Sequence, residues 1–351
     1  MKMKQEKQPV ALLINDIHAS KDNIPEFILN WNEALEICHD KGIGDIVIGG
    51  DLWQSRSSQP LTTLLAVKQA IQKAVQSGIY ITIAEGNHDK VDLNMLLGYS
   101  HIFDGYKDVS VVGDYSIVDL SDVCSLYVMS YFTEDEEFIG HYNEMLKSLS
   151  NDGRVNILYI HEGINGGLAT PTGKELPADM FSDFDKVLVG HYHDRKKIKG
   201  TNIEYIGASR QHNYGEGEMK GYTVLYDDGS YEFIQNKVNI RYKTIDIQFD
   251  NLNDETLSEI RSMKKSGNYK IKARISCDQT NVSSVDKQKL LDAGVNKVEI
   301  DTDNVEISSV DQKRVEQKFD KTGIKREYSV FCEEKDISDV EFGLEYLDKI
   351  N

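Results

Sequence analysis

Asn87, His88 and Asp89 follow one another directly in residues 81–90, whose sequence is ITIAEGNHDK. The β-forming run before them predicts a buried strand, and Gly86 predicts a sharp turn at its carboxyl end. In α/β sheets that edge is where ligands bind. An amide oxygen, an imidazole that titrates near neutrality and a carboxylate could bind a metal ion there or transfer a proton. A polar turn that caps the next helix is the alternative, and this stretch alone supports both interpretations.

Four further strand ends carry residue types that bind metals. These are Asp16 and His18 after 10–14, Asp51 after 45–48, His161 after 155–160, and His191 with His193 after 185–189. Residues two apart in a strand point to the same face, so each of the two pairs can form a fork for a divalent cation. Any one of these strand ends could instead be exposed to solvent and carry polar residues that bind no metal. His191 and His193 could be stacked surface histidines. The same pattern at five strand ends favours a metal site.

The five ends offer oxygen and nitrogen ligands and no thiolate, a set that suits Mn²⁺, Fe²⁺ or Zn²⁺. They provide enough ligands for two cations, which at about 3.5–4 Å apart can clamp the attacking and leaving oxygens of a phosphoryl group. A carboxylate usually bridges such a pair. Asp51 is the best candidate, because the two glycines before it permit a close approach. A hydroxide held between the metals would attack phosphorus in line.

Composition restricts the class of protein. A chain of 351 residues with 40% apolar and 28% charged residues predicts a soluble protein of two or three domains. No apolar run approaches the ~20 residues of a membrane span, and the first residues predict a short tail before a strand, with no signal peptide. The four cysteines form no CxxC pair, which disfavours a disulfide framework or a thiolate zinc site and favours a cytoplasmic location.

The net charge of -18 disfavours non-specific binding of nucleic acid, because a polyanion would be repelled. Bound divalent cations and a local basic patch can invert the field at a site. Arg195, Lys196 and Lys197 form a basic cluster directly behind the histidine pair. A solvated turn is the alternative for this cluster.

Alternating strands and helices indicate crossover connections in a parallel sheet. Helices are predicted over 27–40 and 61–77, between the first three strands. Residues 163–178, rich in glycine, threonine and proline, are predicted to form a mobile loop over a site. Asp228-Gly229 predicts the turn of a hairpin.

The chain changes character near Asn239. Strands are predicted over 242–249, 269–276 and 297–301, and helices over 254–265 and 285–293. This small α/β unit contains no histidine and no glycine-rich phosphate loop, which favours a role in shaping a substrate or binding a partner. An amphipathic helix is predicted over 339–350.

In this order, DxH, GD, GNHD, a lone histidine and GHxH resemble the motifs of the calcineurin-like metallophosphoesterases over about residues 10–235. The resemblance implies an α/β fold, a four-layer α/β/β/α sandwich with two mixed sheets, and a small C-terminal α/β capping domain. The implied division is a nuclease domain over 1–238 and a capping domain, with the terminal helix, over 239–351.

The resemblance also implies the roles of the site residues. One metal ion would be held by Asp16, His18, Asp51 and His193, and the other by Asp51, Asn87, His161 and His191. His88 would contact the phosphate and protonate the leaving oxygen, with Asp89 holding its ring.

Within the superfamily the chain is most similar to the SbcD-type DNA repair nucleases. GDLWQSRSSQP resembles their GDLF segment, YIGASRQHNYGE resembles their stretch ending in FGE, and the unit after Asn239 lies where they carry a DNA-capping domain. The resemblance implies Mn²⁺-dependent exonuclease and endonuclease activity in DNA repair or recombination, a homodimer, and an SbcC-type coiled-coil ATPase as partner. The candidate DNA contacts are Arg56, Arg195, Lys196, Lys197 and Arg210.

Two departures from the family pattern leave alternatives open. Gln54 stands where many members have a histidine or aspartate, which puts the balance of exonuclease and endonuclease action in doubt. The chain also stops soon after the cap, so the terminal helix could serve only in part for docking an ATPase. A phosphoesterase for a small phosphomonoester or cyclic nucleotide, and a binding protein with a vestigial site, are the alternatives. The complete ligand set with His88 argues against the vestigial site.

Overall fold

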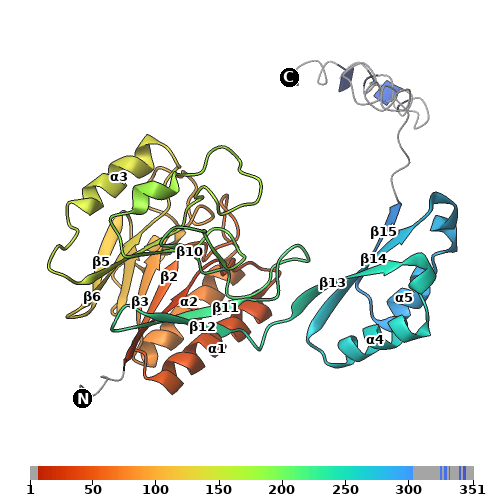
Figure 1. Ribbon diagram of the computed structural model, residues 1–351, viewed down its shortest axis with the longest axis horizontal. Coiled ribbons are helices and arrows are strands. Elements are labelled where there is room, and N and C mark those ends of the chain that lie inside the picture. The colour runs from red at the N-terminus through yellow and green to blue at the C-terminus, as the bar shows by residue number, and fades with distance from the viewer. Residues whose placement is uncertain are drawn as a thin grey trace.

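The computed structural model describes residues 7–302 and single residues of the C-terminal segment, namely 325, 328, 329, 332, 340, 343 and 344. Three β-sheets form the framework of the described residues (Figure 1). The first has the order β12-β11-β1-β2-β3-β4. Its strands are β1 (Pro9–Ile14), β2 (Asp45–Gly49), β3 (Tyr80–Ala84), β4 (Val109–Val112), β11 (Gly221–Tyr226) and β12 (Tyr231–Gln235).

The second sheet has the order β5-β6-β7-β8-β10-β9. Its strands are β5 (Tyr115–Ser121), β6 (Cys124–Met129), β7 (Val155–Ile160), β8 (Lys186–Val189), β9 (Lys196–Lys197) and β10 (Ile203–Tyr205). The helices of this part are α1 (Ile24–Lys41), α2 (Leu61–Gln76) and α3 (Glu136–Leu146), with short 3-10 turns η1 (Tyr99–Phe103) and η2 (Ala178–Phe181).

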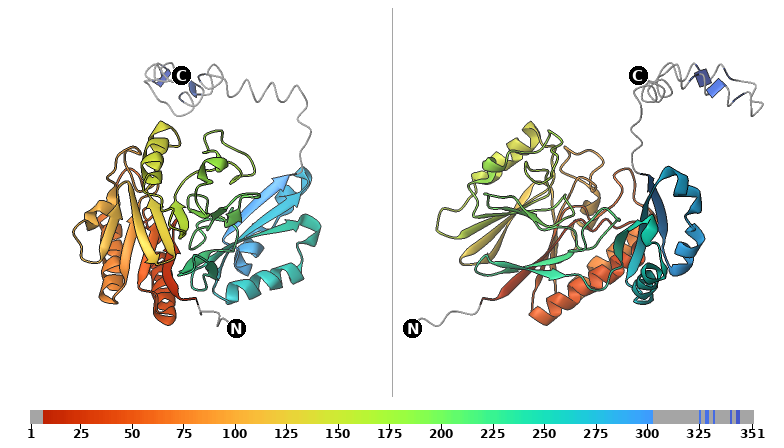
Figure 2. Two further views of the ribbon diagram at one scale, coloured as in Figure 1. Left: turned by 60° about the vertical axis from the view of Figure 1, so that its left-hand side comes forward. Right: turned by 45° about the vertical axis from the view of Figure 1, so that its right-hand side comes forward.

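The two large sheets are the inner layers of an α/β/β/α sandwich. Successive side chains of a strand point to opposite faces, and in β1 both faces are apolar. Leu12 and Ile14 pack with Trp31 in the core beneath α1 and α2. Ala11 and Leu13 pack in the core shared with the second sheet, and a third core lies between that sheet and α3. The predicted fold class is therefore confirmed (Figure 2).

Parallel pairing brings the polar strand ends to one edge. Strands β1, β2, β3 and β4 are parallel neighbours, and Ile48 of β2 pairs with Ile14 on one side and Ile83 on the other. In the second sheet β6, β7 and β8 are also parallel, with Ile160 opposite Val189. The residues that follow these strands therefore lie together at the carboxyl edges of two facing sheets.

Helix α3 begins within the acidic stretch 134–137 and continues to Leu146. Phe138, Tyr142 and Met145 recur at helical spacing and are buried against the second sheet. The predicted helix over 339–350 lies outside the continuous range that the structure describes.

The third sheet belongs to a separate C-terminal unit, residues 241–302. It contains β13 (Arg241–Gln248), β14 (Tyr269–Cys277) and β15 (Lys297–Thr302), all parallel, with helices α4 (Asp254–Lys265) and α5 (Lys287–Ala293) and turns η3 (Phe249–Asn251) and η4 (Gln279–Ser284). Leu257, Ile260 and Leu290 of the helices pack on Ile271 and Ile275 in a core of its own. Within the described part of the chain, no helix combines the length and apolarity needed to cross a membrane.

Candidate metal centre

Four of the predicted ligand residues have a left-handed backbone. Asp16, His18, Asp51 and His191 have φ angles of 51°, 50°, 53° and 86°. Such angles are uncommon for residues with a Cβ and persist only where the surroundings hold them, as at functional sites. Here the turns after β1 and β2 hold each other, because the amide of Asp16 donates to the Gly50 carbonyl at 3.1 Å and the amide of His18 to the Asp51 carbonyl at 2.9 Å.

The two carboxylates and three imidazoles meet in one cluster. Nε2 of His161 lies 3.3 Å from Asp51 Oδ2 and 3.8 Å from Asp16 Oδ1. Nε2 of His18 lies 3.5 Å from Asp51 Oδ2, and Nε2 of His193 lies 3.8 Å from Asp16 Oδ1. The two nitrogens Nε2 of His18 and His193 are 3.1 Å apart. Five potential ligand atoms therefore face one small volume.

The remaining predicted ligands join this cluster. Oδ1 of Asn87 lies 3.2 Å from Nδ1 of His191. The amide of His191 donates to Asp16 Oδ2 at 3.2 Å, and the ring of His191 lies 5.4 Å from that of His161. The structure thus brings all seven predicted ligand residues together at the carboxyl edges of the two facing sheets.

The cluster has the properties of a cation site. Oδ1 of Asp16 and Nε2 of His161 are buried without a hydrogen-bond partner, which would be costly unless something else satisfied them. Two ligands that each lie about 2.1 Å from one cation are roughly 3–3.5 Å apart, close to the separations seen here. Ligand atoms of Asp16, Asp51 and His161 lie within 4.8 Å of one another, as do those of His18, His193 and His212. The residues therefore fit divalent metal ions.

Hydrogen bonds to the outer ring nitrogens orient two of the histidines. Nδ1 of His161 donates to the Gly49 carbonyl at 3.0 Å, and Nδ1 of His193 donates to Glu216 Oε1 at 2.8 Å. A proton held at Nδ1 leaves the lone pair of Nε2 directed at the carboxylates, which is the tautomer that a metal requires. The side-chain amide of Asn15 similarly donates to Asp16 Oδ2 and fixes that carboxylate.

Glycines at the strand ends make room for these side chains. A Cβ atom on Gly50, whose φ is 100°, would lie 2.3 Å from Nδ1 of His161. A Cβ atom on Gly86 would lie 2.2 Å from Asp51 Oδ1. Only glycine fits where the backbone approaches a ligand this closely, and this accounts for the glycines that precede Asp51 and Asn87.

The charges of the cluster shift its pKa values in opposite directions. Burial is the largest influence on His18 and His191 and lowers the pKa of each to about 4. Burial also opposes a charged His161, but the carboxylates of Asp51 and Asp16 outweigh it and raise that pKa to about 10. The metal-free cluster therefore holds a proton at His161 that a cation would replace.

His88 lies beside the cluster, but Asp89 does not orient it. Nδ1 of His88 donates to the backbone carbonyl of Gln54 at 2.7 Å, and its ring lies 4.9 Å from that of His18. The predicted role of Asp89 is wrong. Its carboxylate is buried and accepts hydrogen bonds from the amides of Leu52, Trp53 and Gly86 at 3.3, 2.8 and 2.7 Å. Adjacent side chains of this turn point to different sides.

Two of the predicted DNA contacts are used inside the protein. Arg210 is 4% exposed, and its Nη2 donates to the Ile17 carbonyl at 3.0 Å. Arg195 pairs with Glu204 at 2.7 Å. Neighbouring backbone and acidic groups therefore already bind both guanidinium groups. Lys196 donates to the Gly167 carbonyl at 2.8 Å, whereas Arg56 and Lys197 have exposed side chains.

His212 and Glu216 lie at the cluster but were given no role from the sequence. Nε2 of His212 donates to the Asp16 carbonyl at 2.8 Å, and its ring lies 5.0 Å from the rings of both His18 and His193. Their role could have been predicted from the many polar residues that follow β10 in the stretch YIGASRQHNYGE.

An open pocket adjoins the cluster. Its lining includes residues 167–169 of the glycine-rich loop together with His191, Tyr192 and His193. The placement of the 163–178 loop beside a site is confirmed, and the histidines are accessible to a ligand from this side.

Paired carboxylates and histidines at the carboxyl edges of two facing sheets define the class of this protein as a metal-dependent phosphoester hydrolase. The family model of the calcineurin-like phosphoesterases matches residues 10–195, and the chain belongs to that family. Proteins of this family typically bind two divalent metal ions, in agreement with the candidate ligand groups found here.

Two solved structures show weak overall likeness. A nuclease MPE from Pseudomonas putida has 13% sequence identity and a TM-score of 0.28, and the match covers 62% of this chain and 84% of that one. A cold-active protein tyrosine phosphatase has 15% identity and a TM-score of 0.32, with 65% of this chain and 79% of that one covered. Neither likeness is strong enough to indicate a substrate.

Proposed function

We propose that this protein is a two-metal phosphodiesterase that hydrolyses DNA in repair or recombination, as an SbcD-type nuclease. The observation that carries the proposal is the position of the ligand cluster, which adjoins an open pocket and lies beside the docked C-terminal unit. An extended polymer needs such an accessible site. The C-terminal domain, taken as residues 239–351, would then act as the cap that shapes the DNA.

The proposed ions are two Mn²⁺, with Fe²⁺ or Zn²⁺ as alternatives that the same oxygen and nitrogen donors accept. Asp16, His18, Asp51 and His193 would hold one ion, and Asp51, Asn87, His161 and His191 the other. When bound, the ions would supply Lewis-acid stabilisation of the phosphate and an activated water. The short separations support Asp51 as the shared ligand, because its carboxylate is close to both His18 and His161.

His88 is the proposed proton donor to the leaving oxygen. Its Nδ1 donates to the Gln54 carbonyl, so Nε2 is the nitrogen that can meet a substrate oxygen. A proton given to that oxygen would come from Nε2 of the ring with both nitrogens protonated. Arg56 and Lys197 remain the proposed contacts to the DNA backbone, with Lys196 as a third whose ammonium also binds the Gly167 carbonyl.

A small phosphomonoester or cyclic nucleotide is the second candidate substrate. One observation favours it: the guanidinium groups of Arg195 and Arg210 are bound within the protein. Fewer positively charged side chains are then available to bind the phosphates of DNA. With a net charge of -18, long-range attraction of DNA would depend on the bound metal ions.

The proposed partners are a second copy of the chain and an SbcC-type coiled-coil ATPase, and the proposed location is the cytoplasm. An exposed apolar segment supports the homodimer. Val91, Met95, Leu96 and Leu97 lie directly after the GNHD motif, and all four side chains are exposed. Exposed apolar groups gathered in one segment are typical of a surface that another protein covers.

A cleavage assay with Mn²⁺ tests the proposal, using linear duplex, single-stranded and hairpin DNA beside the small ester bis(p-nitrophenyl) phosphate. We expect DNA to be degraded, and Asp51→Asn to abolish cleavage of every substrate. Lys287→Met, on the surface of α5, is the control and should cleave normally. Cleavage of the small ester alone would reject the DNA substrate, and absence of all cleavage in a protein that binds Mn²⁺ would reject the enzyme.

A further inference from the structure

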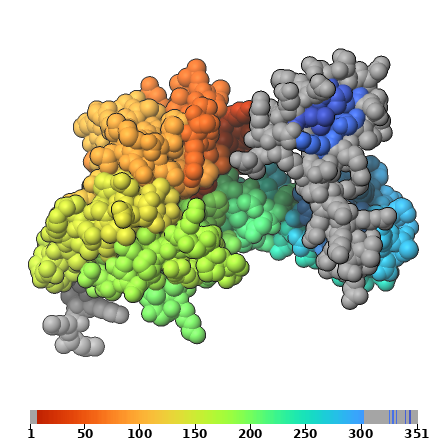
Figure 3. Space-filling model, turned by 90° about the horizontal axis from the view of Figure 1, so that it is seen from above, coloured from red at the N-terminus to blue at the C-terminus, as the bar shows by residue number. Residues whose placement is uncertain are grey.

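Residues 210–216 connect the candidate metal centre with the C-terminal unit, and we call them the strap. The strap follows β10 and precedes β11. In Figure 3 the green surface of this part of the chain lies between the first unit and the cyan-to-blue C-terminal unit. Its side chains divide into two groups, one that contacts the candidate ligands and one that contacts β13.

Glu216 supports His193 directly. Its Oε1 accepts a hydrogen bond from Nδ1 of His193 at 2.8 Å, and its Oε2 accepts one from the amide of His212 at 3.0 Å. The ammonium of Lys220 lies 3.4 Å from Glu216 Oε2 and donates to the His193 carbonyl at 2.5 Å. A carboxylate that holds the outer nitrogen of a metal-binding histidine fixes its ring orientation and tautomer.

Two further strap residues support the left-handed turn after β1. Nε2 of His212 donates to the Asp16 carbonyl at 2.8 Å, and Nη2 of Arg210 donates to the Ile17 carbonyl at 3.0 Å. These bonds act on the backbone that aims the carboxylate of Asp16 and the ring of His18. The strap therefore supports ligands on both sides of the cluster.

Gln211 connects the same strap to the C-terminal unit. Its Oε1 accepts from the amide of Tyr242 at 2.9 Å, and its Nε2 donates to the Tyr242 carbonyl at 3.2 Å. The same Nε2 donates to the Glu216 carbonyl at 2.9 Å. One buried amide group thus binds both strand β13 and the residue that holds His193.

Further contacts with the C-terminal unit also lie near the strap. The rings of Tyr214 and Tyr242 lie 5.1 Å apart, and Thr244 Oγ1 donates to the Tyr214 carbonyl at 3.4 Å. Lys243 pairs with Glu218, two residues beyond the strap, at 2.6 Å. A change in the position of β13 would therefore act on the strap.

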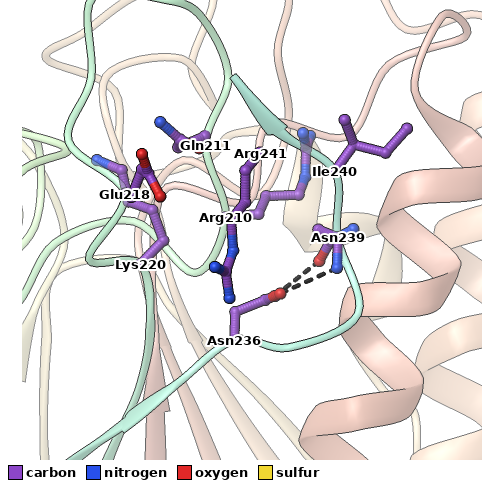
Figure 4. A pocket seen from close by; sticks show the side chains of 8 residues that line it. All are labelled: Arg210, Gln211, Glu218, Lys220, Asn236, Asn239, Ile240 and Arg241. Carbon is purple, nitrogen blue, oxygen red and sulfur yellow. Dashed lines mark hydrogen bonds between the residues drawn. The ribbon is translucent and has the colours of Figure 1, made fainter. Parts of the chain in front are cut away.

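The linker between the two units lies beside the strap as well. Asn236 and Asn239 form a turn in which Asn239 donates its amide to Asn236 Oδ1 at 3.0 Å (Figure 4). Nδ2 of Asn239 donates to the Glu26 carbonyl at 2.7 Å. Arg210 and Gln211 line a small pocket with these two asparagines, so linker and strap face a common space.

We propose that Gln211 and Glu216 are positioning residues, through which the place of the C-terminal unit sets the geometry of His193 and hence the affinity for the cation at that ligand. The inference rests on the proposed two-metal function. Coupling of this kind is reciprocal, so cation binding also stabilises the docked C-terminal unit. Any ligand that moves the unit would change the affinity of the metal centre.

Calorimetric titration of the full-length protein with Mn²⁺ tests this coupling. Gln211→Met keeps the length of the side chain and removes its amide, and Gln211 is not itself a predicted ligand. We expect the affinity for one of the two Mn²⁺ ions, the one that His193 holds, to fall about tenfold. The fall should be similar or larger in Glu216→Ala and smaller in Glu216→Gln, which keeps an acceptor for His193. The falls should not add in the double variant Gln211→Met/Glu216→Ala, because both act through one contact.

Arg274→Met is the matched control. Arg274 pairs with Asp246 at 3.2 Å within the C-terminal unit, so its loss should leave Mn²⁺ affinity unchanged. Wild-type Mn²⁺ affinity in a folded Gln211→Met protein would overturn the proposal, as would additive losses in the double variant. Should Gln211→Met fail to fold, Gln211→Glu provides the same test, because it keeps the acceptor for the Tyr242 amide and loses the donor.

The outcome is separable from that of the proposed function. Affinity for Mn²⁺ is measured without DNA, so a wild-type protein that binds Mn²⁺ and cleaves no DNA would reject the nuclease and leave the coupling testable. A wild-type protein that binds no Mn²⁺ would reject both.

Discussion

Nδ1 of His88 lies 2.7 Å from the backbone carbonyl oxygen of Gln54. A carbonyl can only accept, so this ring nitrogen carries a proton and the tautomer of the neutral imidazole is fixed. The contact holds the ring beside His18 and leaves Nε2 for a substrate. Because the main chain makes this contact, it does not depend on which side chain occupies position 54.

Replacement of His88 should separate catalysis from metal binding. In His88→Asn we expect Mn²⁺ affinity within about twofold of the wild type, whereas kcat falls by about 10²–10⁴-fold, the usual contribution of a general acid. Calorimetry measures the first quantity and steady-state cleavage of a small phosphodiester the second. Loss of Mn²⁺ binding would show instead that His88 is a ligand.

The side chain of Gln54 should matter little for the small ester. It is exposed, and its carbonyl is the group that holds His88. We expect Gln54→Ala to keep kcat and KM within about twofold of the wild type, since the main-chain acceptor remains. A loss of kcat comparable to that of His88→Asn would mean that the amide side chain itself assists the reaction.

Asp89 should act on stability rather than on proton transfer. Its carboxylate accepts three backbone amides in the turns that carry Asp51 and Asn87. Asp89→Ala would leave these buried donors unsatisfied, and we expect a loss of roughly 3–5 kcal/mol of unfolding free energy, with a smaller loss in Asp89→Asn. Urea denaturation in the presence of a chelator measures this without the metals. Unchanged stability combined with a large fall in kcat would instead favour a catalytic role for Asp89, through the ring of His88.

The fold and the convergence of the ligands were predictable because both depend on local patterns. Apolar runs that end in a polar residue specify buried strands, and parallel pairing brings Asp16 and Asp51 to one edge. His161 joins them because the second sheet packs against the first. The helix expected over 254–265 has the bounds of α4, because its periodicity and Asn253 N-cap are local as well.

The sequence could not predict the direction of individual side chains or the contacts between residues that are distant in the chain. Spacing shows that His88 and Asp89 are adjacent, but the direction of each side chain is decided by acceptors and donors from the turn after β2. Arg210 is buried because the strap crosses the turn after β1, a contact between residues 193 positions apart. Glu216 meets His193 for the same reason, and no local pattern indicates such a pairing.

The exposed segment after GNHD should mediate self-association. Val91 and Leu97 are 71% and 61% exposed, which is high for apolar residues in one short segment. We expect a wild-type dimer, and a monomer for the double variant Val91→Lys/Leu97→Lys, because two buried ammonium groups on each copy would oppose association. Val123→Lys is the control, since Val123 is 55% exposed in another part of the surface. Sedimentation equilibrium distinguishes these outcomes, and a monomeric wild type would contradict the prediction.

Affinity for Mn²⁺ should rise with pH, because the metal displaces a proton. The carboxylates of Asp51 and Asp16 overcome the effect of burial and raise the pKa of His161 to about 10, so its imidazole is charged at pH 7 and must become neutral to bind a cation. Each pH unit below neutrality should therefore cost about tenfold in affinity.

The other histidines set how steep this dependence is. His18 and His191 have pKa values lowered to about 4, are neutral from pH 6 to 8 and should add nothing. Burial lowers the pKa of His193, but Glu216 and Asp16 outweigh it and raise that pKa, so His193 should contribute to the second proton. Calorimetry in buffers of different ionisation enthalpy counts the protons, and we expect between one and two. Release of no proton at pH 7 would mean that the metal-free cluster keeps His161 neutral.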